Sequence, residues 1–423
     1  MLKKLLGICQ NKQFLNLSVY GFGQLFNLVT PLLVVPYIVG ICGEENFGKS
    51  AVGMALCFFL MVFIDYGSDL VGIREVSINR DNKEILQNLF STTMAAKLVL
   101  LIAVMILMII AIYSIPFFAV EKKLFLLQLT VLVGQFLNPT WFLQGVENVK
   151  WITISNIISK VIYLGCIFLI IQSEQDYVYI NLFWGLGMML SNGSFLYLII
   201  KKYNFTFKHI QGNDILRFLK KDFNIFTSQI FFSSQMFLPV ILISYFGSNL
   251  MAGQYKIVEQ VILIFKTYIL LFFNFVFPKV CFLLDKNKQS GMNNWKLFNG
   301  LNFIFITLSM VVIYFFSYDI VAYFNPTNRY VLSNLLQIAV LYPIVFAVST
   351  PLKQLVLAWN YRKFYVNLTS IIVVLNLLSI IFLLPIFKIY GVFYSLIISE
   401  VIIILFYLLC IRKEIFVKSK PNF

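Results

Sequence analysis

Apolar runs long enough to cross a membrane follow one another along the whole chain, separated by short polar segments. A helix needs roughly 20 apolar residues to span about 30 Å of hydrocarbon. Because a spanning segment must satisfy its backbone hydrogen bonds internally, the pattern predicts an all-α polytopic membrane protein with about twelve transmembrane helices. The expected spans are 14–40, 47–71, 88–113, 122–144, 151–172, 178–200, 221–246, 252–281, 295–317, 330–358, 364–386 and 389–411.

Composition excludes a soluble domain of any size. The 423 residues are 60% hydrophobic and only 12% charged, and the mean hydropathy is +0.87. An ordinary soluble domain is about 25% charged. The first apolar run is too long for a signal-peptide core and no small-residue cleavage site follows it, so we interpret it as a retained helix.

The net charge is +15, and the distribution of the Lys and Arg residues along the chain predicts the membrane topology. If the N-terminus is cytoplasmic, most Lys and Arg residues fall on the inside segments, and the outside loops keep only Lys49, Lys122, Lys123, Arg329 and Lys388. Such a bias sets orientation, so both termini are expected in the cytoplasm. The excess charge then contacts anionic membrane lipids, and nucleic acid is not an expected partner.

The longest interior break, at about 203–220, contains a Gly-Asn-Asp turn signal at residues 212–214. We expect an N-terminal six-helix lobe at 1–202, a cytoplasmic linker at 203–220, and a C-terminal six-helix lobe with a short cytoplasmic tail at 221–423. A weak internal repeat supports pseudo-symmetric lobes, although chance similarity is an alternative. The matching positions are Asn27, Pro31 and Tyr37 against Gln235, Pro239 and Tyr245.

Residues for catalysis or cofactor binding are not recognisable in the sequence. There is no Gly-rich phosphate loop and no Ser/His/Asp or Cys/His set. The six cysteines are scattered singly, and His209 is the only histidine. We therefore expect no cofactor, no metal site and no catalytic residue. A membrane polymerase or acyltransferase stays an alternative, which an extracytoplasmic catalytic loop would reveal, but the expected outer loops are short.

Ionisable residues inside the spans are the candidate functional groups, because each costs a few kcal/mol in the membrane unless it is paired or hydrated. Lys97 and Lys353 are near enough to the cytoplasmic ends to snorkel to the headgroups, which is one interpretation of them. Lys160, Lys266 and Glu400 are nearest to mid-membrane. The complete set is Asp65, Asp69, Lys97, Lys160, Lys256, Glu259, Lys266, Lys353 and Glu400.

The eighth expected helix has one polar side. Lys256, Glu259 and Lys266 fall at i, i+3 and i+10, a spacing that keeps them on one helical face. Lys256 and Glu259 either neutralise each other or both face a ligand. Lys266 has no such partner nearby in the sequence. This helix therefore favours a hydrated central cavity whose occupant is an anion.

The first expected helix carries an uncharged polar stripe, and Pro31 and Pro36 are expected to kink it. The stripe has the spacing i, i+4, i+7 and i+11, and it consists of Tyr20, Gln24, Asn27 and Pro31.

Three segments resemble the Wzx-type polysaccharide flippases of the multidrug/oligosaccharidyl-lipid/polysaccharide exporter superfamily. The most specific is Asn138-Pro139-Thr-Trp141-Phe142-Leu-Gln144-Gly145-Val-Glu147, which is similar to the end of their fourth helix. The others are Pro31-Leu-Leu-Val-Val-Pro36-Tyr37 with the Gly-Glu-Glu-Asn-Phe-Gly segment at 43–48, and Asp65-Tyr66-Gly67 followed by Arg74. The family often has a basic residue where Gly40 stands, so a role for that charge is not transferred.

The resemblance implies a flippase that moves undecaprenyl-pyrophosphate-linked O-antigen repeat units across the bacterial inner membrane. It further implies two lobes around a cationic cavity, alternating access, coupling to an ion gradient, and the O-antigen polymerase machinery as a partner. Alternatives are a capsule or other glycan-lipid exporter and a drug or small-cation exporter with an acidic cavity.

Our hypothesis assigns two sets of site residues. Binding of the pyrophosphate and sugars is assigned to Lys266, Lys160, Lys256, Asn27 and Gln24. Exchange of a coupling cation is assigned to Glu400, Glu259 and Asp69.

Overall fold

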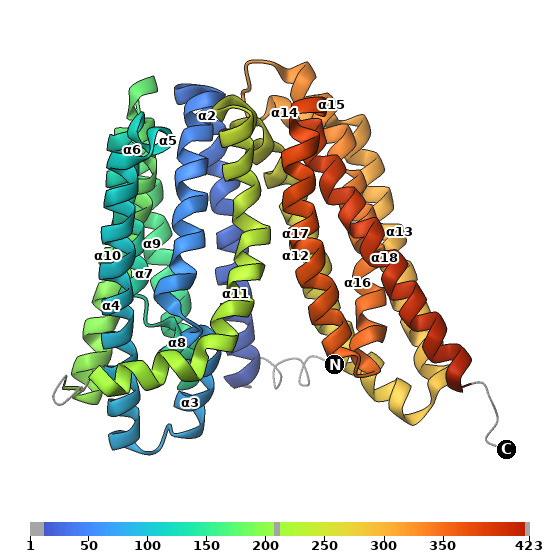
Figure 1. Cartoon of the computed structure of the whole chain (residues 1–423), viewed down its shortest axis with the longest axis horizontal. Helices are drawn as coiled ribbons and strands as arrows, with labels where there is room; N and C mark the ends of the chain where they lie inside the picture. The colour runs from blue at the N-terminus through green and yellow to red at the C-terminus, as the bar shows by residue number, and fades with distance from the viewer. Residues whose placement is uncertain (1–11, 207–211, 419–423) are drawn as a thin grey trace, which may run out of the picture. The chain divides into compact units, whose positions relative to one another are not determined.

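The computed structural model describes residues 12–206 and 212–418, and its regular elements in those ranges are all helices (Figure 1). The chain divides into two compact units, Met1–Leu238 and Pro239–Phe423. In the first, the elements are α2 (Lys12–Asp65), η1 (Ser68–Gly72), α3 (Ile73–Ile78), α4 (Lys83–Ser114), α5 (Pro116–Ala119), α6 (Lys122–Leu127), α7 (Leu129–Phe136), α8 (Thr140–Gly145), α9 (Val149–Ile170), η2 (Glu174–Tyr179), α10 (Ile180–Tyr203) and most of α11 (Gly212–Phe246). The second holds the end of α11 and then α12 (Asn249–Lys286), α13 (Lys288–Phe315), α14 (Ser317–Ala322), α15 (Arg329–Ala339), α16 (Leu341–Ala358), α17 (Arg362–Phe387) and α18 (Tyr390–Lys418).

Within the described ranges, eleven helical segments are long and apolar enough to cross a membrane. The first of them, Phe26–Asp65, has 40 residues, which at 1.5 Å per residue is about twice the hydrocarbon thickness. It therefore contains two of the expected spans. The expected all-α membrane fold with about twelve helices is confirmed.

The connection between the first two spans is one residue and not the loop expected at 41–46. Gly43 has φ 79° and ψ 165°, and the backbone is helical on both sides of it. Glycine adopts this conformation easily because it has no Cβ. Pro31 and Pro36 both lie inside the helix.

Two of the expected spans are interrupted helices. The span expected at 122–144 consists of α6, α7 and α8, and the one at 330–358 consists of α15 and α16. Pro139 has no N–H for a helical bond, and the Asn138 Oδ1 accepts a hydrogen bond from the Thr140 backbone N–H at 3.0 Å. Side-chain capping of this kind satisfies backbone groups that the break frees inside a membrane protein.

Part of the expected linker is helical, because α11 begins at Gly212. The first part of α11 packs within unit 1. Phe226 stacks on Tyr66 with ring centroids 4.2 Å apart, and Phe237 lies 5.4 Å from Phe58. For this reason the boundary between the compact units falls after Leu238, inside α11. His209 lies outside the described residues, and the assignment of two moving lobes stays a prediction.

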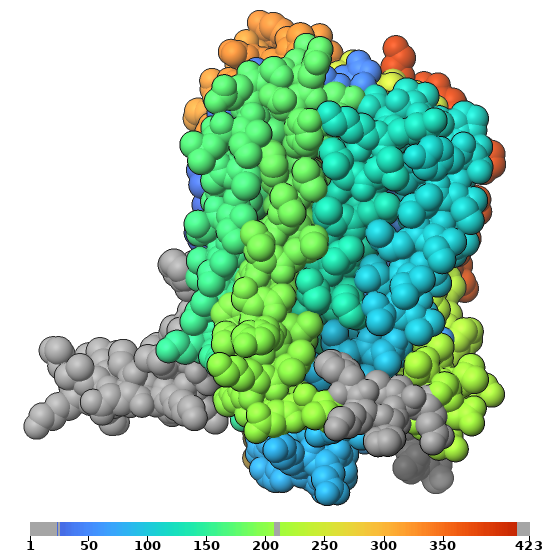
Figure 2. All heavy atoms as spheres, turned by 90° about the vertical axis from the view of Figure 1, so that its left-hand side faces the viewer, coloured from blue at the N-terminus to red at the C-terminus, as the bar shows by residue number. Residues whose placement is uncertain are grey.

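Helices α4 and α10 lie on the side of unit 1 that faces the viewer in Figure 2. They carry the side chains expected of a surface in contact with lipid. Exposed side chains on α4 and α10 are mostly large and apolar. On a soluble protein such an extended apolar surface would be unusual. Examples on α4 are Leu98, Val99, Ile102, Ile106, Leu107 and Ile110, and on α10 they are Leu190, Tyr197 and Leu198.

Helices α7 and α10 approach each other closely through glycine. A Cβ built on Gly185 would lie 2.2 Å from the Thr130 Oγ1 and 2.7 Å from the Val131 backbone nitrogen. Small residues allow this approach between membrane helices, where dispersion contacts replace the hydrophobic effect.

Gly185→Ala is expected to destabilise the protein by about 1–3 kcal/mol, because the added methyl group forces α7 and α10 apart. Thermal unfolding in lipid nanodiscs measures the effect. Gly165→Ala on α9 is the matched control, because a Cβ there meets nothing within 4 Å. Equal unfolding temperatures for the two variants would contradict the packing argument.

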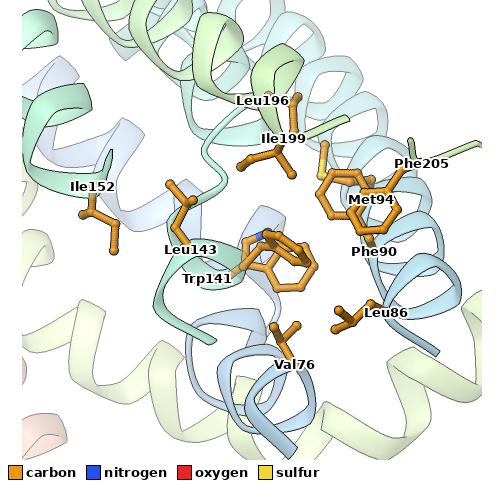
Figure 3. Packing of buried hydrophobic residues seen from close by; sticks show 11 residues of the cluster. Val76, Leu86, Phe90, Met94, Trp141, Leu143, Ile152, Leu196, Ile199 and Phe205 are labelled. Carbon is orange, nitrogen blue, oxygen red and sulfur yellow. The ribbon is translucent and has the colours of Figure 1, made fainter. Parts of the chain in front are cut away.

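The centre of one hydrophobic cluster in unit 1 is Trp141 of α8 (Figure 3). Its ring stacks on Phe90 of α4 with centroids 5.9 Å apart and meets Phe142 edge-on. Val76 and Leu86 pack in the same cluster. The cluster fixes the short helix α8 against α3 and α4.

Candidate functional site

Lys266 lies on α12 within unit 2, and its ammonium group faces aromatic rings of α16. The Nζ is 5.7 Å from the ring centroid of Tyr342 and 5.9 Å from that of Phe346. No ion pair of Lys266 is found among the described residues. The aromatic faces compensate part of the lost hydration of the ammonium. Lys266 therefore keeps its capacity to bind an anion.

Glu400 of α18 is the nearby acid. Its side chain is buried at 6% exposure, and the Ser349 hydroxyl is its hydrogen-bond partner. The cations whose charges act on it are Lys266 and Lys353. The Lys353 Nζ lies 5.1 Å from the ring centroid of Phe273. The predicted residues Lys266 and Glu400 are thus brought together by α12, α16 and α18.

Lys256 and Glu259 form an ion pair on α12. The mutual neutralisation considered from their i, i+3 spacing is therefore present. The Tyr255 hydroxyl donates to the Glu259 Oε1 at 3.1 Å. Tyr342 interacts electrostatically with both Glu259 and Glu400. Polar groups therefore continue through unit 2 from Glu259, past Tyr342, to Glu400.

Unit 1 has a buried ion pair of its own. The Lys97 Nζ lies 2.8 Å from the Asp65 Oδ1, and the two side chains are only 1% and 8% exposed. The Gln135 amide donates to the Asp65 Oδ2 at 2.7 Å, and Asn138 donates to Gln135 at 3.3 Å. The interpretation that Lys97 snorkels is wrong, because a carboxylate on the neighbouring helix pairs with it inside the protein.

Asp69 lies in η1, one turn beyond Asp65 and after the end of the membrane-spanning part of α2. Repulsion by the Asp65 carboxylate, together with partial burial, raises the pKa of Asp69 to about 7, while Lys97 acts in the opposite direction. The pKa of Asp69 therefore lies closer to neutral pH than that of an ordinary aspartate.

Lys160 of α9 is half-buried, and its Nζ lies 3.2 Å from the ring centroid of Trp184 on α10. Like Lys266, it makes no ion pair within the part of the chain that the structure describes. Asn27 is half-buried on α2, and the side chain of Gln24 lies outside the described part. The predicted residues are thus divided between units: Lys160, Asn27 and Asp69 belong to unit 1, and Lys256, Glu259, Lys266 and Glu400 to unit 2.

Sequence reasoning named Lys353 as a charge inside its span but missed the three other members of its stripe on α16. Tyr342, Phe346, Ser349 and Lys353 have the spacing i, i+4, i+7 and i+11, the same as the polar stripe of the first helix. This stripe could have been found by the same test of helical periodicity. The Asp65–Lys97 pair had no such signal, because its members lie on different helices.

Residues 15–280 match the family described as "Polysaccharide biosynthesis protein". The chain belongs to this family. The resemblance to polysaccharide flippases that was carried by the sequence motifs is therefore confirmed at the level of the family.

Two curated relatives match this protein over nearly its whole length. A "Putative O-antigen transporter" of Escherichia coli (strain K12) is 21% identical over 92% of this chain and 94% of its own length. A protein of the same description from Shigella dysenteriae is 23% identical over 93% of this chain and 98% of its own.

Solved structures share the fold. "Lipid II flippase MurJ, inward closed conformation" superimposes with a TM-score of 0.74 at 17% identity, over 93% of this chain and 87% of that one. An inward-facing multidrug resistance MATE family transporter of the MOP superfamily gives a TM-score of 0.73 at 14% identity, over 93% and 96%. At these identities the similarity establishes a common all-α membrane fold and no more.

Proposed function

We propose that the protein is a flippase that moves O-antigen repeat units linked to undecaprenyl pyrophosphate across the bacterial inner membrane. Membership of the polysaccharide biosynthesis family and the two O-antigen transporter relatives support this assignment. The observation that carries the substrate class is Lys266, a half-buried cation whose partners are aromatic rings and not a bonded carboxylate.

The chemistry of the substrate requires such a group. A pyrophosphate with a polar glycan cannot cross about 30 Å of hydrocarbon unaided. A lysine in surroundings of low dielectric attracts the pyrophosphate strongly, and charge-assisted hydrogen bonds to its oxygens fix it in place. Lys160, over Trp184, supplies a second cation, and Lys256 contributes when the anion competes with Glu259 for it. Asn27 and Gln24 contact the sugars.

Transport proceeds by alternating access and is coupled to an ion gradient. Glu400, Glu259 and Asp69 are the groups that exchange the coupling cation. Glu400 is the strongest of the three because it is buried and lies within the field of Lys266. Binding of a proton or cation there releases Lys266 from that field and changes its affinity for the anionic cargo. The residues in this scheme bind and move charge, and none is catalytic.

A multidrug exporter is the second candidate, because a MATE family transporter has the same fold. Lysines without bonded acids in both units favour an anionic cargo over a cationic drug. A capsule or other glycan-lipid exporter would use the same cationic groups. A polymerase or acyltransferase is a weaker alternative because no described residue set suggests its chemistry.

Deletion of the gene tests the function. Undecaprenyl-linked repeat units are expected to accumulate on the cytoplasmic leaflet, while surface O-antigen falls to background. Protease-protected lectin labelling of inverted and right-side-out vesicles measures the leaflet. Repeat units that accumulate on the outer leaflet would point to a polymerase defect instead, and unchanged surface O-antigen would refute the proposal.

A further inference from the structure

A cavity of about 230 Å³ lies within unit 1, and none of the described side chains assigned to the pyrophosphate, the sugars or the coupling ion lines it. Its walls come from η1, α3, α4, α8 and the first part of α11. Figure 1 shows α3 and α8 at the same end of the unit. By the charge distribution of the loops, this is the end expected in the cytoplasm.

Asp222 of α11 is the unusual member of the wall. The residue is 1% exposed, and neither carboxylate oxygen has a hydrogen-bond partner among the described residues. The nearby Lys221 instead pairs with Glu75, at 3.0 Å. A buried carboxylate without a partner is strongly unfavourable, so its retention indicates a ligand that donates hydrogen bonds.

Trp141 supplies the opposite kind of group to the same cavity. Its side chain is buried at 2% exposure, and its indole N–H has no acceptor in the described part of the chain. Packing holds the ring in place on Phe90 (Figure 3). The position of Gly72 is equally constrained, because a Cβ there would lie 3.0 Å from the Trp141 Cε3.

The cavity therefore contains an unused acceptor and an unused donor, together with the hydroxyl of Thr92, the amide of Asn88 and the ring of Phe218. A sugar ring satisfies all of these, since its hydroxyls both donate and accept and its C–H face packs on aromatic rings.

The wall of the cavity also carries Arg217 and Lys221, and Lys221 pairs with Glu75. A phosphate would be attracted by Arg217 but repelled by the buried carboxylate of Asp222, and a metal cation has no acceptor for the indole N–H. The volume is below the roughly 300–1,000 Å³ of pockets for drug-sized ligands, which suits a single ring.

We propose that this cavity binds one sugar ring of the lipid-linked glycan at the cytoplasmic end of unit 1. The inference rests on the proposed function, because it takes the glycan of that substrate as the ligand. It adds a sugar-recognition site that is separate from the lysines, so the protein recognises the cargo by sugar as well as by charge.

The test uses the full-length protein in phospholipid nanodiscs prepared without glycoside detergents. Saturation-transfer NMR with methyl glycosides of hexoses and N-acetylhexosamines measures binding, with sodium chloride and inorganic phosphate as competitors. At least one glycoside is expected to bind the wild type. Asp222→Asn and Trp141→Phe should each weaken it by at least about tenfold. Asp222→Asn keeps the shape but replaces a charged acceptor by a neutral amide, and Trp141→Phe removes the indole N–H together with part of the ring.

The matched control is Asp81→Asn, an exposed carboxylate in the loop before α4 that is absent from the cavity wall. It should bind like the wild type. Asp222→Asn should also unfold at the same temperature as the wild type or higher, because it removes an unpaired buried charge. A purely structural Asp222 would give lower stability instead.

Three results would overturn the inference: no glycoside signal with the wild type, equal binding by Asp222→Asn, or displacement of the glycoside by sodium or phosphate alone. Failure of the cavity assignment can be distinguished from failure of the proposed function. If the deletion strain shows that the protein exports O-antigen and the wild type binds no glycoside, only the cavity assignment falls. If export is unaffected by deletion, the flippase proposal falls whatever the nanodiscs show.

Discussion

Lys266→Ala is expected to reduce surface O-antigen by at least about thirty-fold without lowering the amount of protein in the membrane. The charge pair in question is the one that Lys266 forms with the pyrophosphate of the proposed substrate. Loss of one partner from such a desolvated pair costs about 2–5 kcal/mol, which corresponds to a thirty-fold change or more. Protein level should be maintained because Lys266 has no ion pair among the described residues. When this lysine is removed, Glu400 keeps the Ser349 hydroxyl and the charge of Lys353. Electrophoresis of lipopolysaccharide and immunoblotting of membranes measure the two quantities.

Two variants serve as controls for this experiment. Lys296→Ala removes an exposed lysine from α13 and should leave export unchanged. Lys266→Arg keeps the charge but changes its shape, so it should retain part of the activity. Normal O-antigen in Lys266→Ala at wild-type protein level would refute the role of this residue in holding the pyrophosphate.

Breaking the Asp65–Lys97 pair is expected to have the largest effect on stability. Lys97→Met leaves the Asp65 carboxylate uncompensated in the interior, and Asp65→Asn does the same to the ammonium of Lys97. Each single change should destabilise unit 1 by about 3–5 kcal/mol. The double variant Asp65→Asn/Lys97→Met should recover most of the loss, because it leaves no buried charge. Thermal unfolding and hydrogen exchange in nanodiscs measure the cycle.

A surface pair of similar length gives the comparison for this cycle. Arg80 and Glu147 are 3.1 Å apart but their side chains are 49% and 73% exposed. Arg80→Ala should therefore change stability by less than about 1 kcal/mol. If Lys97→Met and Arg80→Ala were equally mild, the buried pair would have no special structural role.

The helices were largely predictable because the membrane imposes a length and a composition on each span. The points at which the helices are interrupted were less predictable. Gly43 stands in a segment rich in polar residues, which is typical of a loop, yet a single residue with positive φ is sufficient to turn the chain. The break at Pro139 lies inside an apolar run, and the proline was the signal in the sequence that could have predicted it.

The candidate site was predictable as a set of residue types but not as a set of contacts. Lys266 and Glu400 were both recognised as charges deep in their spans. Their proximity depends on how α12 and α18 are rotated about their axes, which one sequence does not specify. The same applies to Asp65 and Lys97, which are 32 positions apart along the chain. Asp222 was missed because it stands at the polar start of an expected span, where a carboxylate is ordinary.

Helix α11 runs without interruption from Gly212 to Phe246, across the division between the two compact units. The chain passes from one unit to the other within α11, so any reorientation of the units has to be accommodated by this helix. Either the helix bends at Pro239, which lacks the N–H for a backbone hydrogen bond, or its first turns separate from unit 1. Those first turns include Asp222. A glycan bound there, as we propose, would oppose the separation of these turns from unit 1, so cargo binding and any reorientation of the units would be energetically coupled.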